Sequence, residues 1–159
     1  MPIMLTDNLS EMKLSEATFD DIPELTDLLT LLFTQEVEFE SDPDKQGKGL
    51  RQIIGNPEIG RILILRDENF LIGMVSLLFT VSTALGGRVA ILEDMIVHPN
   101  ARGKGVGSDL IQHAVDFART NGCFRITLLT DRTNSEAIRF YRKHGFASSE
   151  MIPLRLLLV

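Results

Sequence analysis

The sequence has little cysteine: among 159 residues there is only Cys123, which excludes an internal disulfide framework. A chain without disulfides is typical of a reducing compartment, so we expect a cytoplasmic protein. Long hydrophobic runs are also missing, because no stretch reaches the roughly 18 apolar residues of a membrane span. The N-terminal segment MPIMLTDNLSEMKL has no basic region followed by an apolar one, which argues against a signal peptide. We therefore expect no membrane association.

Basic residues are fewer than acidic residues. Lys and Arg total 16 against 22 Asp and Glu, which gives a formal net charge of -6. A nucleic-acid partner would need a basic face, so we expect none. The three histidines, His98, His113 and His144, are far apart in the sequence and have no metal-ligand spacing. The sequence therefore predicts no metal site.

What is present is the pattern of one α/β (α+β) domain over residues 1–159, without linker, repeat or low-complexity tract. Residues 12–16 predict a short strand, and a helix follows Asp20 because Leu25, Leu28, Leu29 and Leu32 recur at helical spacing. Acidic residues, proline and glycine over 37–49 predict a break, and residues 50–55 a short helix. Three apolar runs at 61–67, 70–83 and 88–97, separated by short turns, predict an antiparallel meander.

The rest of the chain predicts a crossover. A helix over 105–120 and a strand over 124–130 follow the meander, so the strands on either side of this helix should be parallel. A second short helix over 134–145 ends at a glycine. Residues 148–159 predict one or two final strands.

The segment VHPNARGKGVGSDL, residues 97–110, is rich in glycine between a strand and a helix. Gly103, Gly105 and Gly107 cost conformational entropy on folding, so a compensating interaction is expected. The first N–H groups of a helix lack partners and favour an anion, and glycine lets a phosphate approach them closely. Arg102 and Lys104 would add positive charge, so the segment predicts a phosphate site.

We compared this segment with three known sequence patterns of phosphate-binding loops. A Walker A loop fails, because no Gly-Lys pair is followed by Ser or Thr. A dinucleotide fingerprint is weak, because the spacing is G-x-G-x-G and a meander precedes it. The third pattern, R-x-x-G-x-G, matches at Arg102, Gly105 and Gly107.

A second motif, N-x-x-A-x-x-F-Y-x-x-x-G-F, occurs in NSEAIRFYRKHGF, residues 134–146. With these two motifs in this order, the sequence resembles the GNAT (Gcn5-related N-acetyltransferase) family. The resemblance covers residues 91–146, about a third of the chain. It implies a mixed, mostly antiparallel sheet with helices on both faces. Two central parallel strands, at 92–97 and 125–130, would splay apart.

The resemblance also implies acetyl-CoA as cosubstrate. Its pyrophosphate would lie on the amides of residues 103–108, and its pantetheine arm along the strand edge at 95–97. The expected contacts are Met95, Ile96, Val97, Arg102, Gly103, Lys104, Gly105, Val106, Gly107, Ser108, Asn134, Ala137 and Tyr141.

By the same resemblance, a primary amine would attack the thioester directly in a ternary complex, with the Ile96 N–H facing the oxyanion. Tyr141 occupies the family's general-acid position, the alternative being an aromatic core residue. Glu93 resembles the position of a general base. Asp94 is the second candidate, and both could instead be structural. Alternation predicts that these adjacent carboxylates point to opposite faces of the sheet.

The acceptor is less defined. Glu36, Glu38, Glu40 and Asp42 could receive a cationic amine or form a solvated loop, and the segment from residue 92 resembles the polyamine acetyltransferase branch. A non-catalytic acyl-CoA-binding module is the alternative function. Many relatives are homodimers, and the apolar C-terminal PLRLLLV could pair at an interface or complete the sheet.

Overall fold

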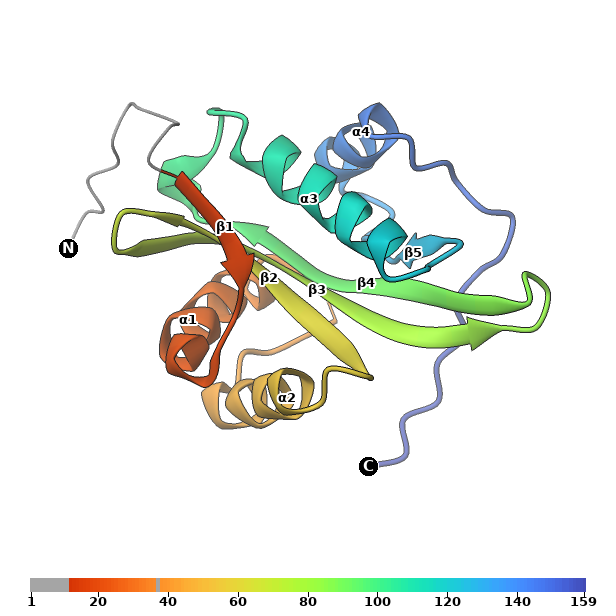
Figure 1. The fold of residues 1–159 in the computed structure, drawn as a ribbon, viewed down its shortest axis with the longest axis horizontal. Helices are drawn as coiled ribbons and strands as arrows, with labels where there is room; N and C mark the ends of the chain where they lie inside the picture. Colours follow the sequence, from red (N-terminus) through yellow and green to blue (C-terminus); the bar gives the residue numbers. More distant parts are fainter. Residues whose placement is uncertain (1–11, 37) are drawn as a thin grey trace.

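A computed structural model describes residues 12–36 and 38–159 and has one five-stranded sheet between two pairs of helices (Figure 1). Residues 1–11 of the predicted domain lie outside the described part. The strands follow sequence order: β1 (Met12–Glu16), β2 (Gly60–Asp67), β3 (Phe70–Ser82), β4 (Gly87–Val97) and β5 (Ile126–Leu128). The first four strands pair antiparallel, and β4 and β5 pair parallel. The predicted mixed sheet is therefore confirmed.

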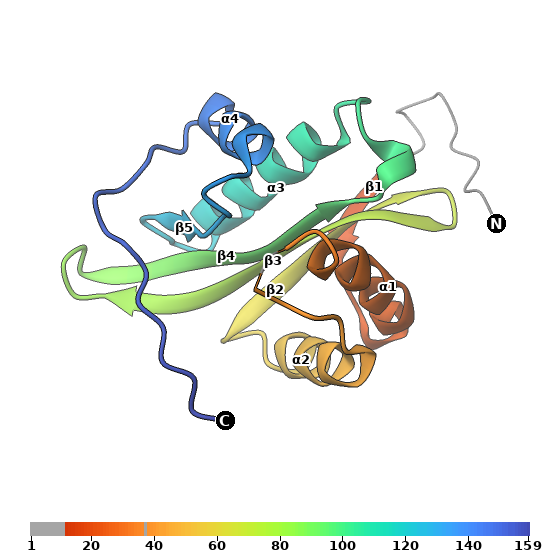
Figure 2. The ribbon, with the colours of Figure 1, turned by 180° about the vertical axis from the view of Figure 1, so that it is seen from behind.

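Helices cover both faces of the sheet (Figures 1 and 2). One face carries α1 (Ile22–Phe33) and α2 (Pro43–Gly55), and the other carries α3 (Val106–Thr120) and α4 (Ser135–Lys143). Two short 3-10 turns, η2 (Phe19–Asp21) and η3 (Pro99–Ala101), precede α1 and α3. Within the described ranges, no helix combines the length and apolar character needed to cross a bilayer.

The core is divided by the sheet into two clusters. Leu63 and Leu65 of β2 pack toward α3, while their neighbours Ile62 and Ile64 pack toward α1 and α2. Because both faces of β2 are covered, its central residues 62–65 are apolar without interruption instead of alternating with polar ones. This explains why the predicted strands are such continuous apolar runs.

Helix α2 begins earlier than expected, at Pro43, so the predicted break over 37–49 is wrong in its second half. The Asp42 side chain caps the helix by accepting hydrogen bonds from the N–H groups of Asp44 and Lys45. Gln46 then donates to the Thr26 carbonyl at 3.0 Å, which fastens α2 to α1. These contacts offset the low helix propensity of Gly47 and Gly49 in the first half of the helix.

The predicted final strands are absent: residues 148–159 contain neither helix nor strand and are exposed. This tail leaves α4 and passes the sheet without joining it (Figures 1 and 2). The edge strand β5 is only three residues long, so it offers a partner little backbone to pair with. The tail is instead held by Arg155, which forms an ion pair with Glu38 and lies over the ring of Phe39.

The β4–β5 pairing ends at Leu92 and Leu128, and β4 continues to Val97 paired only with β3. At the same point the register between β3 and β4 shifts, because Leu92 faces Leu77 and Asp94 faces Ser76. Glu93 is the extra residue of this β-bulge, which bends and twists a strand. The two parallel strands therefore separate beyond Leu92.

Candidate active site

A groove of about 570 Å³ lies where β4 and β5 separate. Its walls come from the end of β4, the loop after β5, the start of α3, helix α4 and the end of α1. The lining includes twelve of the thirteen expected cofactor contacts, Lys104 being the exception, together with Glu93. The lining also includes four residues that were not among the expected cofactor contacts: Gln35, Glu36, Thr130 and Asp131.

The open edge of β4 presents Met95 and Val97 to the groove. The His98 N–H donates to the Ile72 carbonyl of β3 at 2.7 Å, whereas the Val97 carbonyl accepts from Arg102 Nε at 3.1 Å. Backbone groups alternate in direction along a strand, so those of Ile96 face β3. The expectation that the Ile96 N–H faces an oxyanion in the groove is therefore wrong, and the N–H of Met95 takes that direction.

The glycine segment forms a turn that only glycine adopts readily. Gly103 and Gly105 have φ of +78° and +79°, and at either position a Cβ would have no atom within 4 Å of it. Glycine is therefore required by the backbone conformation and not by crowding. Gly105 is the N-cap of α3, so the N–H groups of residues 106–108 open the helix without an intrahelical partner.

Gly107 has a different role, because α3 and α4 approach each other here. A Cβ at Gly107 would lie 3.4 Å from the ring of Phe140 on α4. Beside it, Ser108 Oγ lies 3.0 Å from His144 Nε2, just after α4. The Asn134 Oδ1 accepts from the Ala137 N–H and so caps α4. The second sequence motif therefore builds a helix that packs against the glycine turn.

Tyr141 lies on α4 and lines the groove from the α3 face of the sheet. Its ring makes edge contacts with Phe140 and Phe146, at centroid distances of 5.3 and 5.6 Å. Burial, assisted by the charge of Glu36, raises the pKa of Tyr141 to about 12. The hydroxyl is therefore protonated at neutral pH and can donate a proton.

Two carboxylates near the bulge have strongly raised pKa values. Burial, followed by the charge of Glu93, raises the pKa of Asp94 to about 6, although a hydrogen bond from Ser76 Oγ opposes the shift. The pKa of Glu36 is raised to about 7, first by burial and then by the carboxylates of Asp94, Asp131, Glu93 and Glu38. Both groups can exchange protons near neutral pH.

The structure separates Glu93 from Asp94. Glu93 lines the groove, whereas Asp94 bonds to Ser76 and is not part of the lining. Of the acidic loop, Glu36 lines the groove, while Asp42 caps α2 and Glu40 lies outside the lining. Asp131 could have been found from the sequence, because ligands in α/β proteins bind beyond the carboxyl ends of parallel strands.

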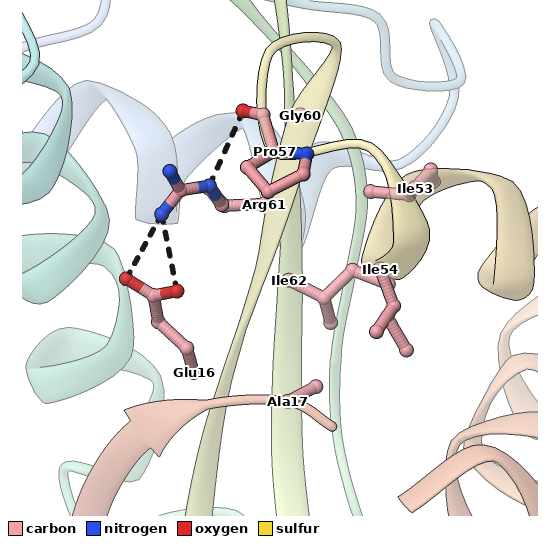
Figure 3. A pocket seen from close by; sticks show the side chains of 8 residues that line it. All are labelled: Glu16, Ala17, Ile53, Ile54, Pro57, Gly60, Arg61 and Ile62. Carbon is pink, nitrogen blue, oxygen red and sulfur yellow. Dashed lines mark hydrogen bonds and ion pairs between the residues drawn. The ribbon is translucent and has the colours of Figure 1, made fainter. Parts of the chain in front are cut away.

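A second pocket, of about 120 Å³, lies between the end of α2 and the start of β2 (Figure 3). Its Arg61 donates through Nη1 to both Glu16 carboxylate oxygens, at 3.2 and 3.1 Å, and through Nε to the Pro57 carbonyl. The rest of the lining is mainly apolar. Because the guanidinium is engaged by these partners, the described lining of this pocket offers no free charged group for chemistry.

In the described part of the chain, no group of three His, Cys, Asp or Glu residues could hold a metal ion.

Residues 22–146 match the acetyltransferase (GNAT) family. This stretch is well over half of the chain and contains the splayed strands, the glycine turn and the Tyr141 helix. The protein therefore belongs to the acetyltransferase (GNAT) family.

Curated relatives match over different lengths. An uncharacterized N-acetyltransferase of Bacillus subtilis, YhfO, is 38% identical over 85 residues, which cover 54% of this chain and 57% of YhfO. Streptothricin acetyltransferase of Streptomyces lavendulae is 46% identical over 35% of this chain and 30% of its own length. The chain therefore aligns with only about half, or less, of these two relatives. The aminoalkylphosphonate N-acetyltransferase of Salmonella typhimurium is 26% identical, with 86% of each chain covered.

Solved structures share the whole fold. An integron cassette protein from the Cole Harbour salt marsh metagenome superposes with a TM-score of 0.80 at 26% identity, covering 92% of this chain and 90% of its own. An aminoglycoside acetyltransferase from a soil metagenome, meta-AAC0020, superposes with a TM-score of 0.79 at 19% identity, covering 95% and 99%. The second likeness concerns the fold alone.

Proposed function

We propose that this protein transfers the acetyl group of acetyl-CoA to a primary amine. One observation carries the proposal: a single groove joins the N-terminus of helix α3, an open strand edge and a half-buried, protonated tyrosine. A phosphate-bearing ligand with an amide-rich arm needs the first two features. Acyl transfer to an amine uses the third.

The groove suits acetyl-CoA. The N–H groups of residues 106–108 and Arg102 would hold the diphosphate, and the turn at Gly103 and Gly105 leaves their approach open. The backbone groups of Met95 and Val97 would pair with the pantetheine amides. The thioester supplies an activated acetyl group.

Each chain residue then has a defined task. The Met95 N–H is directed to where negative charge develops on the thioester carbonyl oxygen. Tyr141, neutral because its pKa is about 12, protonates the leaving thiolate. A groove carboxylate, Glu93 in the sequence-based prediction, receives the proton of the amine.

The acceptor we propose is a small cationic amine such as a polyamine. Glu36, Glu93 and Asp131 line the groove and would attract an ammonium group. The name of one relative, aminoalkylphosphonate N-acetyltransferase, agrees with an amine as acceptor. A cytoplasmic location and a homodimer remain predictions.

The test is a free-thiol assay with acetyl-CoA and a panel of polyamines, aminoglycosides, amino acids and peptide N-termini. We expect amine-dependent thiol release, strongest with a small polycation. CoA binding without thiol release for every amine would contradict catalysis and favour the non-catalytic acyl-CoA-binding module. Binding is measured separately by thermal shift, since a ligand at 100 times its Kd adds about 2.7 kcal/mol of stability.

A further inference from the structure

We infer that Glu36, in the loop just after α1, is the group that takes the proton from the acceptor amine, in place of Glu93 on β4. The inference rests on the proposed acetyl transfer. It assigns a catalytic residue to the side of the groove opposite α4.

Position is the first argument. Glu36 follows the last turn of α1 and lines the groove together with Leu32 and Gln35. Tyr141 lines the same groove from α4, and the Glu36 carboxylate is close enough for its charge to act on the tyrosine hydroxyl. The two groups that must accept and donate protons therefore share one space, which a reacting amine would enter.

The second argument is that the other carboxylates are less suited. The side chain of Asp94 bonds to Ser76 and does not line the groove. Glu93, at the bulge, is exposed to solvent, whereas Glu36 is half-buried. A base that is partly withdrawn from water is better matched to removing a proton near neutral pH.

The third argument is the charge around Glu36. The acidic groups facing it are Asp94 and Glu93 of β4, Asp131 after β5 and Glu38 of its own loop, together with the Tyr141 hydroxyl. Glu38 is paired with Arg155, and the groove cations are Arg102 and Lys143. This anionic surround, with burial, brings the pKa of Glu36 to about 7. Glu36 is therefore ready both to accept and to release a proton at neutral pH.

The proton balance is simple. The ammonium form of the acceptor gives one proton to Glu36, and the freed nitrogen lone pair forms the bond to the acetyl carbon. The C–S bond breaks, the sulfur takes its electron pair, and Tyr141 supplies the proton of the thiol. The second proton lost by the nitrogen restores Tyr141, and Glu36 releases its proton to solvent.

The first test compares Glu36→Gln with Glu93→Gln and with Glu40→Gln, a matched control in the same loop but outside the groove lining. We expect Glu36→Gln to lower kcat/KM by about 100-fold or more and to abolish the rise of activity with pH, with the Kd for CoA unchanged. Glu40→Gln should stay within about 3-fold of the parent. Loss of activity in Glu93→Gln with a normal pH profile in Glu36→Gln would overturn the inference. Absence of thiol release in the unmodified protein would instead overturn the proposed function.

A second test needs no turnover. Tyr141 is the only tyrosine and there is no tryptophan, so intrinsic fluorescence reports on this ring alone. A nearby ionised carboxylate quenches tyrosine, so emission should fall as pH rises through about 7 in the parent protein and in Glu40→Gln. The transition should disappear in Glu36→Gln. A transition that survives in Glu36→Gln, or none in the parent, would contradict the assignment.

Discussion

Replacing Asp94 by asparagine should stabilise the protein at alkaline pH. Asp94 is partly buried on β4, and its Oδ2 accepts from Ser76 Oγ at 3.3 Å. The amide oxygen of asparagine can accept the same hydrogen bond, so the substitution keeps the shape and removes the charge. The substitution therefore removes the free-energy cost of holding an ionised carboxylate in a poorly solvated position beside Glu93.

The size of the effect follows from the pKa of Asp94, which is raised from 3.8 to about 6 by burial and by Glu93. Since one pKa unit is worth about 1.4 kcal/mol, the ionised side chain costs about 3 kcal/mol on folding. A raised pKa means that the folded state holds the proton more tightly. The stability linked to this proton is therefore full below about pH 3.8 and is lost as pH rises through about 6.

The assay is urea unfolding of the parent and of Asp94→Asn at several pH values, followed by circular dichroism. We expect Asp94→Asn to be more stable by about 2–3 kcal/mol near pH 8, a gain of roughly 5–10 °C in Tm, with little difference near pH 3. Equal stability near pH 8 would refute the reasoning. A gain of the same size at both pH values would point to packing instead of charge.

Four further substitutions test the site and the core around it. Tyr141→Phe should lower kcat by about 100-fold or more in the thiol assay with little change in CoA affinity, and unchanged turnover would remove Tyr141 from the mechanism. Gly105→Ala should destabilise the protein by about 1 kcal/mol and weaken CoA binding, because φ is +79° at this position. Its control is Gly49→Ala, in α2 with open space around it, which should stabilise the protein by up to about 1 kcal/mol in the same urea titration. Leu110→Ala should cost about 2–5 kcal/mol in urea unfolding, because this side chain is fully buried between α3 and the sheet. A loss below about 1 kcal/mol would mean that the α3 core is loosely packed.

Much of the fold was predictable because local signals and tertiary packing agree. β2, β3 and β4 are apolar runs bounded by turns, and α1 and α3 carry apolar residues at helical spacing. The start of α2 had a usable signal in Asp42 followed by Pro43, a cap and a first-turn proline, but two nearby glycines pointed the other way. Residues 148–159 are strand-like in composition, yet a strand forms only where a partner edge is available.

The candidate site was predictable in part. The two motifs located a little over half of the groove lining, because the turn at Gly103 and Gly105 depends on local backbone conformation. The association of Glu36 with Asp94 and Tyr141 was not predictable, because these residues are distant in the sequence and meet only when α1 packs beside β4. Their pKa shifts depend on burial and mutual charge, which are properties of the folded state.

The bulge at Glu93 explains why the open edge and the carboxylates occur together. Before it, Ala90 and Leu92 pack toward α3, and after it Ile96 packs toward α1. If Glu93 were instead paired with β3 in a regular strand, the alternation would turn the backbone groups of Met95 and Val97 toward β3 and those of Ile96 toward the groove. The single inserted residue therefore sets which amides face the groove, moves β4 away from β5, and leaves Asp94 beside Ser76. The proposed pantetheine pairing and the acidity of the groove thus have one structural cause, and no feature of composition or periodicity around residue 93 marks it.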